Sequence, residues 1–181
     1  MLLVNSNHTA LEIAHRAHQG QVDKQGEDYI KHPLSVAFML LPFGDRAYMA
    51  GLLHDVVEDS DYSLEDLKNA GIPDSVVCAV ELVSRPKDSN LTYLQWIDSL
   101  KNTSWDEGDL LTRAELSEAG IRDGIAVPLA VLVKLADNYH NSLSSRSQGL
   151  PEGMLKRYSR ARNILEQDIP DTVLRILLRR M

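Results

Sequence analysis

The chain has 181 residues, 44% of them hydrophobic, and a formal net charge of −7. This length suits one domain with a sizeable core, because domains cluster at about 100–200 residues. The negative charge excludes a global basic field of the kind that recruits nucleic acid or an anionic membrane surface. An anionic ligand would therefore need a local basic patch or a bound metal.

The number of cysteines and the length of the apolar runs indicate the cellular compartment of the protein. The single cysteine, Cys78, has no partner for an internal disulfide and is flanked by apolar residues, which suits core packing in a reducing compartment. The first residues lack the apolar stretch of a signal peptide, and no apolar run approaches the roughly 18 residues of a membrane span. We therefore expect a cytoplasmic protein that engages no membrane.

Apolar spacing indicates helices along the whole chain, without a convincing set of alternating strands. We therefore expect an all-α fold, one compact helical bundle over residues 1–181. Residues 20–29 form a polar loop that leads to Pro33, which is well placed at a first helical position. The acidic residues 103–124 are expected to be an insertion, either a loop or a helical excursion. One expected helix begins near residue 32. The others are expected to cover residues 9–19, 45–59, 63–70, 73–84, 91–102, 125–141, 152–168 and 171–180.

Two apolar segments leave alternatives. Residues 127–133 alone would fit a buried strand, but the pattern continues to Asn141, which is too long for a typical strand and favours a helix. Near the C-terminus an apolar stripe lies between arginines, and it would pack either on the core or on another copy of the chain in a homo-oligomer. The stripe consists of Val173, Leu174, Ile176, Leu177 and Leu178.

The strongest chemical signal is the run LLHDVVED. On a continuous helix His54, Asp55, Glu58 and Asp59 would fall within an arc of about 140°. The apolar flanks place this arc inside the protein, where burying an imidazole and three carboxylates without compensation is costly. A divalent cation would supply the missing charge. The alternatives are a buried polar network and a solvated face, and the apolar flanks argue against the second.

Two further segments offer ligands. Asp137, in KLADNYHN, follows an apolar stretch and would lie at the buried end of its helix, although alone it would equally suit a cap or an ion pair. His32 lies near the end of the polar run GQVDKQGEDYIKHPL, and a lone histidine before proline is only a weak indication of a metal ligand. With His54 and Asp55 they supply two imidazoles and two carboxylates, a set that suits Mn²⁺, Fe²⁺ or Zn²⁺ better than Mg²⁺ or Ca²⁺.

Four protein ligands would leave positions on a six-coordinate metal for water and a phosphate oxygen. The metal could then lower the water pKa and neutralise the phosphoryl oxygen. Glu58 and Asp59 lie next to that site, and their natural role would be to orient or deprotonate the attacking water. The basic residues Arg85, Arg146, Lys156, Arg157 and Arg160 could include phosphate-binding side chains, and His15 and His18 a second metal pair.

The order of His32, then His54-Asp55, then Asp137 resembles the HD superfamily of phosphohydrolases. More narrowly, the runs GQVDKQGEDYIKHPL, LLHDVVED and KLADNYHN resemble the hydrolase domain of RelA/SpoT homologues, and the size is similar to that of the stand-alone small alarmone hydrolases of the Mesh type. The resemblance covers about residues 10–165. It implies removal of the 3′-pyrophosphate from guanosine tetra- or pentaphosphate, with Mn²⁺ as the usual metal.

The resemblance also implies roles for individual residues. Glu58 and Asp59 match the pair that handles the water. Lys24 and Asn141 match nucleotide-contacting positions, and Tyr158 matches a tyrosine near the nucleotide. The implied metal ligands are His32, His54, Asp55 and Asp137.

Asp23 departs from the family pattern, in which a basic residue next to the base usually precedes the matched lysine. A guanidinium can stack on a purine and donate to guanine O6 and N7, whereas a carboxylate can only accept, for instance from the adenine N6 amine. If Asp23 contacts the base, we therefore expect adenosine 3′-pyrophosphates to be substrates as well. Alternatively, Asp23 points into solvent and another residue reads the base.

Two other functions compete with alarmone hydrolysis. An HD nucleotidase could act on a 5′-monophosphate or a cyclic nucleotide, but the loop of residues 24–32 and the Glu58-Asp59 pair argue against it. A non-catalytic, metal-containing nucleotide sensor is the second alternative. Retention of all four ligands together with both acidic water-handling residues favours an enzyme.

Overall fold

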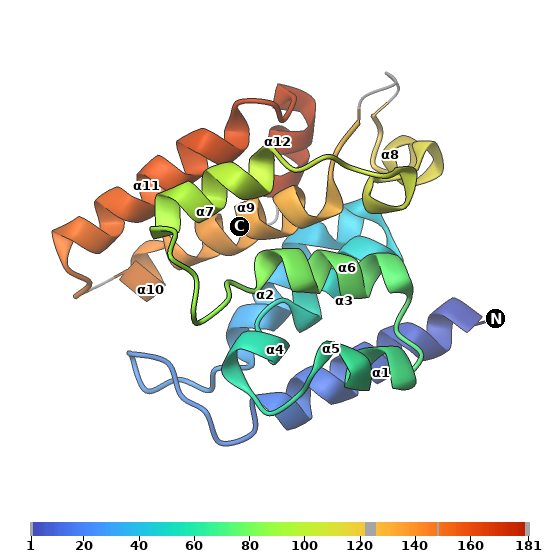
Figure 1. Cartoon of the computed structure of the whole chain (residues 1–181), viewed down its shortest axis with the longest axis horizontal. Helices are drawn as coiled ribbons and strands as arrows, with labels where there is room; N and C mark the ends of the chain where they lie inside the picture. Colours follow the sequence, from blue (N-terminus) through green and yellow to red (C-terminus); the bar gives the residue numbers. More distant parts are fainter. Residues whose placement is uncertain (1, 122–125, 148, 180–181) are drawn as a thin grey trace.

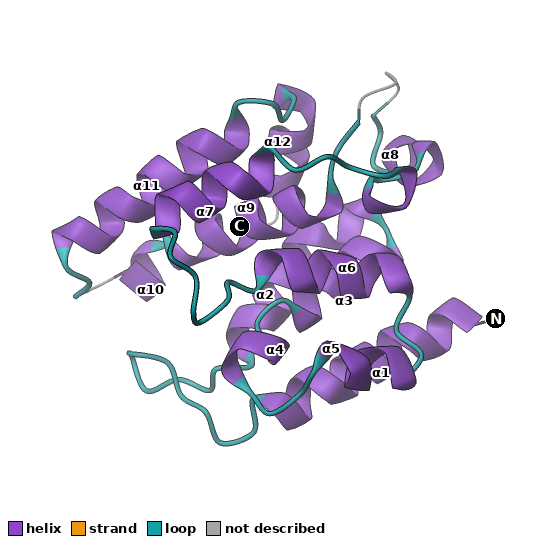
Figure 2. Ribbon diagram, viewed as in Figure 1, coloured by secondary structure: helices purple, strands orange, loops and turns teal. Residues whose placement is uncertain are grey.

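The computed structural model describes residues 2–121, 126–147 and 149–179 (Figure 1). Over these residues the secondary structure is helical and contains no named strand, which confirms the expected all-α class (Figure 2). Isolated β-bridges join Val22 to Asp28 and Leu110 to Pro128. Among the described helices, none is long and apolar enough to cross a membrane.

The helices follow one another with short connections. In chain order they are α1 (Leu2–Ala17), α2 (Lys31–Leu40), α3 (Asp45–Leu53), α4 (Val56–Asp59), α5 (Leu64–Asn69), α6 (Asp74–Val83), α7 (Tyr93–Lys101), α8 (Arg113–Glu118), α9 (Leu129–Asn141), α10 (Ser144–Ser147), α11 (Glu152–Glu166) and α12 (Asp171–Leu178), with 3₁₀ turns η1 (Leu41–Phe43) and η2 (Glu107–Asp109). The expected start of the first helix at residue 9 was wrong, because Asn and Ser are only weakly unfavourable inside a helix.

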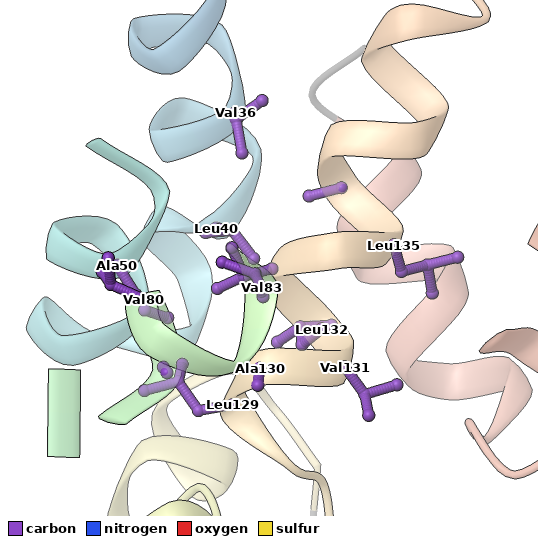
Figure 3. Close-up of a cluster of buried hydrophobic side chains, with 14 of the residues drawn as sticks. Val36, Leu40, Ala50, Val80, Val83, Leu129, Ala130, Val131, Leu132 and Leu135 are labelled. Atoms are coloured by element: carbon purple, nitrogen blue, oxygen red, sulfur yellow. The ribbon is translucent and has the colours of Figure 1, made fainter. Parts of the chain in front are cut away.

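Helix α9 runs through the middle of the molecule. It contacts α2, α3 and α6, and it also contacts α7 and α11 (Figure 1). Leu129 and Leu132 belong to the same buried apolar cluster as Leu40 and Val83, while Leu135 projects toward the C-terminal helices (Figure 3). Every residue from 129 to 138 is buried, so α9 is apolar nearly all round and its few polar side chains must find partners inside the protein.

The expected helix over residues 125–141 begins only at Leu129. Pro128 has extended backbone angles, φ −66° and ψ 128°, and a proline disfavours helical backbone in the residue before it. Val127 accepts a backbone hydrogen bond from Leu111 across the small bridge. Residue 125 lies outside the described part of the chain.

The expected continuous helix over residues 45–59 was also wrong. It is divided into α3 and α4, with His54 and Asp55 between them, and Asp55 has φ −100° and ψ −6°. Neighbouring residues on a regular helix point about 100° apart. At the junction of α3 and α4 the two consecutive side chains nevertheless approach each other, with His54 Nε2 3.1 Å from Asp55 Oδ2.

Close packing of α2 against α3 brings the two histidine-bearing segments together. A Cβ atom added to Gly51 would lie 2.8 Å from the Cα atom of Ala37, which is too close for any other residue. The absence of a side chain at Gly51 therefore allows the two helices to approach. His32 in α2 and His54 just beyond α3 are positioned by this contact.

The described part of the segment 103–124 is more ordered than a simple loop. It contains η2 and α8, and the guanidinium of Arg46 donates to both carboxylate oxygens of Glu115 at 2.8 and 2.7 Å. This bidentate pair ties α8 to α3. Trp105 is partly buried against the core. Residues 122–124 lie outside the described residues.

The C-terminal apolar stripe packs on the chain's own core. Val173 and Leu177 in α12 are fully buried, and α12 contacts α2. Of the two alternatives for this stripe, packing on the core is therefore confirmed.

Candidate metal centre

Four side chains from three segments meet in the core. The Nε2 atom of His54 lies 3.3 Å from Nε2 of His32, 3.1 Å from Oδ2 of Asp55 and 3.7 Å from Oδ1 of Asp137. His32 Nε2 lies 3.4 Å from the same Asp55 oxygen and 3.2 Å from the same Asp137 oxygen. The structure thus brings together all four residues that the sequence predicted as ligands.

The two imidazole rings are oriented so that their Nε2 atoms face this cluster. His54 Nδ1 lies 2.8 Å from the carbonyl oxygen of Gly51 and donates to it, so Nε2 is the nitrogen that faces the cluster. His32 Nδ1 lies 2.7 Å from Nδ1 of His140. Burial, with the charges of His32 and Arg146, lowers the pKa of His140 to about 3, so the neutral ring of His140 can accept a hydrogen bond from the Nδ1–H group of His32.

The electrostatics of the cluster are those of a site built for a cation. Burial works to raise the pKa of Asp55, but the neighbouring His54 and His32 outweigh it and hold that pKa well below its usual range. Burial would lower the pKa of His54, but Asp55 and Asp137 outweigh it and raise that pKa to about 10. Burial works to raise the pKa of Asp137 as well, but Lys134 and the two histidines outweigh it and hold that pKa well below its usual range. Both carboxylates are therefore anionic at neutral pH and attract positive charge.

The donor set fits a divalent transition metal. Metal–donor bonds of about 2.0–2.2 Å place neighbouring donors of one ion about 3 Å apart. The donor separations here, from 3.1 Å between His54 and Asp55 to 3.7 Å between His54 and Asp137, are close to that spacing. Without a metal ion the raised pKa of His54 keeps its imidazole protonated, and a cation held by the four donors would take the place of that proton.

Asp137 is held by two side chains of its own helix. Lys134 Nζ lies 2.9 Å from Oδ2, and Asn141 Nδ2 donates to Oδ1 at 2.5 Å. Lys134 is buried and also lies over the ring of Trp96 at 5.0 Å. Burial would lower the pKa of Lys134, but Asp137 outweighs it and raises the pKa, so the lysine stays charged. Together these contacts orient the Asp137 carboxylate toward the histidines.

Glu58 and Asp59 lie beside the cluster on the short helix α4. Glu58 Oε2 accepts a hydrogen bond from the backbone N–H of Arg85 at 3.2 Å, and burial raises the pKa of its carboxyl group. Burial, together with the charge of Asp55, also raises the pKa of Asp59. A raised pKa makes each group a better proton acceptor than an ordinary surface carboxylate.

Tyr29 connects the centre to the polar loop. Its hydroxyl lies 2.8 Å from Oδ2 of Asp55 and 3.3 Å from Oδ2 of Asp59, and it donates to these oxygens. Its ring centroid lies 5.0 Å from that of His18, and His18 Nδ1 lies 2.8 Å from Gln21 Oε1. His18 therefore supports the loop. It does not form a metal pair with His15, which is exposed.

A cavity of about 340 Å³ adjoins the centre between the polar loop, the end of α9 and α11. Tyr29 and Asn141, which bond to Asp55 and Asp137, also line this cavity. The four residues that the sequence predicted to contact substrate all line it as well: Asp23, Lys24, Asn141 and Tyr158. Its remaining walls are Val22, Gln25, Arg146 and Leu150.

Comparison with known proteins agrees with this geometry. Residues 10–152 match the family described as HD domain. The chain belongs to the HD-domain family. Its described helices are those of an HD domain, and His32, His54 and Asp137 form a candidate metal-binding cluster in the core.

Several relatives of this HD domain have names that state an activity. A guanosine-3′,5′-bis(diphosphate) 3′-pyrophosphohydrolase of Haemophilus influenzae is 39% identical over 131 residues, 71% of this chain and 17% of that protein. The bifunctional (p)ppGpp synthase/hydrolase SpoT of Escherichia coli K12 is 34% identical over 131 residues, 71% of this chain and 16% of that protein. A GTP pyrophosphokinase of Streptomyces coelicolor is 34% identical over 139 residues, 76% of this chain and 14% of that protein. The HD domain thus spans about a sixth of these relatives' length.

A solved structure shares the fold. It is described as a metazoan orthologue of SpoT that hydrolyses ppGpp and acts in starvation responses. The TM-score is 0.68 at 22% sequence identity, and the match covers 96% of this chain and 94% of that one.

Three residues of this HD domain's centre had no assigned role in the sequence analysis: Tyr29, Lys134 and His140. For Lys134 a signal was present, because a lysine three residues before Asp137 on a buried helix faces the same side. Tyr29 and His140 could not be assigned in this way, since their partners lie 26 and 108 residues away.

Proposed function

We propose that this HD domain is a metal-dependent phosphohydrolase that removes the 3′-pyrophosphate of guanosine 3′,5′-bis(diphosphate) and related nucleotides. The products would be the nucleoside 5′-di- or triphosphate and pyrophosphate. The main supporting observation is the four-donor centre that shares Tyr29 and Asn141 with the cavity. The name of the Haemophilus influenzae relative supports the choice of substrate.

The proposed metal ligands are His32, His54, Asp55 and Asp137, and Mn²⁺ is the proposed ion because two nitrogen and two oxygen donors suit it. When bound, such an ion lowers the pKa of a water molecule and neutralises charge on a phosphoryl oxygen. The protein contributes the orientation of the donors, through Gly51 on His54 and through Lys134 and Asn141 on Asp137.

Glu58 and Asp59 are the proposed catalytic residues. With its pKa raised by burial, Glu58 is suited to accept a proton from the attacking water. Its carboxylate is held in place by the Arg85 backbone N–H. Asp59 shares the Tyr29 hydroxyl with Asp55, so it is suited to orient the same water.

The cavity residues are proposed to hold the nucleotide. Lys24 lies at the cavity wall with no carboxylate partner among the described residues, so its ammonium is available for a phosphate group. Tyr158 offers an aromatic face on which a base can stack. Asn141 can contact the sugar or the 3′-phosphate, because it bridges the cavity and Asp137. Asp23 closes the cavity on the side of the polar loop.

The site assignments argue against both alternatives. A metal-containing sensor needs no general base, yet Glu58 and Asp59 lie beside the cluster with raised pKa values. A nucleotidase for 5′-monophosphates needs no polar loop beyond the centre. We also propose a cytoplasmic location, because the single cysteine, Cys78, forms no internal disulfide and suits a reducing compartment.

The proposed function predicts the identity of the first product. Attack on the phosphorus next to the 3′-oxygen releases pyrophosphate in one step, so we expect stoichiometric pyrophosphate from guanosine 3′,5′-bis(diphosphate) with Mn²⁺. Ion-exchange chromatography of early time points measures it, with guanosine 5′-diphosphate as a control substrate that lacks the 3′-group. Orthophosphate as the first product, or equal turnover of the control, would assign the protein to another class of nucleotide hydrolase.

Tyr29→Phe should weaken the centre without unfolding the protein. The substitution keeps the ring that contacts His18 but removes the hydroxyl that donates to Asp55 and Asp59. Loss of a hydrogen bond to a metal ligand typically costs about 10–100-fold in metal affinity or activity. Metal titration and steady-state kinetics measure the effect, with Tyr62→Phe as the control. Unchanged affinity and turnover would show that the hydroxyl does not support the site.

A further inference from the structure

The Asp23 carboxylate is already engaged by its own loop. Its Oδ1 atom accepts hydrogen bonds from the backbone N–H groups of Gln25 at 2.9 Å and Glu27 at 3.0 Å. Its Oδ2 atom pairs with the Arg146 guanidinium at 3.3 Å. Burial works to raise the pKa of Asp23, but these contacts outweigh it and lower the pKa. An anionic carboxylate with both oxygens engaged has little capacity left to contact a base directly.

Arg146, 123 residues further along the chain, lines the same cavity and contacts Asp23 there. Its carbonyl oxygen accepts a hydrogen bond from Gln25 Nε2 at 3.0 Å, so the polar loop holds both its backbone and its side chain. The side chain is mostly buried, with 17% of its surface exposed. Nη1 alone contacts Asp23, and a guanidinium carries five N–H donors, so donors remain that can face the cavity.

We propose that Arg146, oriented by Asp23, reads the purine base of the bound nucleotide and favours guanine over adenine. This inference rests on the proposed function and names the base-selecting residue of the same site. The planar guanidinium can donate to guanine O6 and N7 together, whereas adenine presents a donor at N6 in place of O6. Asp23 is then a positioning residue that acts through Arg146.

Charge separates this role from phosphate binding. The Asp23 carboxylate, whose Oδ2 lies 3.3 Å from Arg146 Nη1, offsets the positive charge of the guanidinium and would repel a phosphate group bound beside it. Lys24, the next residue in the chain, has no such carboxylate partner among the described residues, and its Nζ lies 3.6 Å from Met154 Sδ. The unpaired lysine thus suits the phosphates, and the paired arginine suits the neutral base edge. Tyr158 in the same cavity can stack on that base.

Binding of guanosine and adenosine 5′-diphosphates to the metal-loaded protein tests the inference without turnover, because neither carries a 3′-pyrophosphate. Isothermal titration calorimetry should show wild type binding the guanosine nucleotide about 10-fold or more tightly. Arg146→Ala should remove this preference, and Arg146→Lys should not restore it, since an ammonium lacks the planar fork. Asp23→Asn should reduce the preference, because it keeps an oxygen for the loop but loses the ion pair.

Two controls make the result specific. Lys24→Ala should weaken binding of both nucleotides by a similar factor, and exposed Arg113→Ala should change neither affinity. Equal affinity of wild type for the two nucleotides would overturn the proposal. So would an equal loss for both nucleotides in Arg146→Ala, which would make Arg146 a phosphate-binding residue.

Failure of the proposed function can be distinguished from failure of the base-reading role. If wild type prefers guanosine 5′-diphosphate through Arg146 but releases no pyrophosphate from guanosine 3′,5′-bis(diphosphate), the base-reading role stands and the hydrolase assignment falls. If pyrophosphate is released but Arg146→Ala leaves the ratio of kcat/KM for the guanosine and adenosine substrates unchanged, the hydrolase assignment stands and the base-reading role of Arg146 falls.

Discussion

Replacing His54 by alanine or Asp137 by asparagine should release the metal and abolish hydrolysis. Each substitution removes one of four donors whose contacts lie between 3.1 and 3.7 Å. Asp137→Asn has a further effect, because it removes the charge that balances buried Lys134 at 2.9 Å. Metal content of the purified variants, measured by inductively coupled plasma mass spectrometry, and pyrophosphate release under saturating substrate are the two readouts.

Metal removal from wild type is the companion experiment. Chelation should abolish activity, and added Mn²⁺ should restore it. The matched control is His15→Ala, an exposed histidine outside the centre, which should keep both metal and activity. Full activity of metal-free wild type would contradict the assignment of these residues as ligands to a required ion.

Glu58→Gln should retain metal and fold but lose turnover by about 10²–10⁴-fold, the usual contribution of general acid–base catalysis. The amide keeps the shape of the side chain and still accepts from the Arg85 backbone N–H, yet it cannot take up a proton. We expect kcat to fall while metal content and the melting temperature stay near wild type. The division between metal ligands and water-handling residues rests on this contrast with His54→Ala.

A variant at a nearby acidic residue sharpens the comparison. Glu65→Gln changes an exposed carboxylate on α5 and should leave kcat unchanged. If Glu58→Gln instead loses metal to the same extent as Asp137→Asn, Glu58 is itself a ligand. If its kcat matches wild type, another group accepts the proton.

Much of this protein follows from sequence alone. Apolar spacing predicted the helical class, because each amphipathic segment must bury one face, and the apolar run before Asp137 predicted a buried helix. The apolar flanks of His54-Asp55 predicted that charged groups lie inside the core. Buried charge is stable there only if a cation or a hydrogen-bonded network compensates it. The types of donor then restricted the class of metal. These conclusions depend on local pattern and residue chemistry, which sequence contains.

Tertiary structure decided the rest. The break between α3 and α4 was not visible in the pattern, since the residues around His54 and Asp55 are as apolar as those of a continuous helix. The support of His32 by His140 and the pairing of Asp23 with Arg146 join residues 108 and 123 positions apart. Such contacts arise only when packing brings distant segments together, and periodicity carries no information about distance in space. For this reason sequence named the candidate ligands of the centre, whereas only the folded chain showed which residues orient them and which cationic side chains line the adjoining cavity.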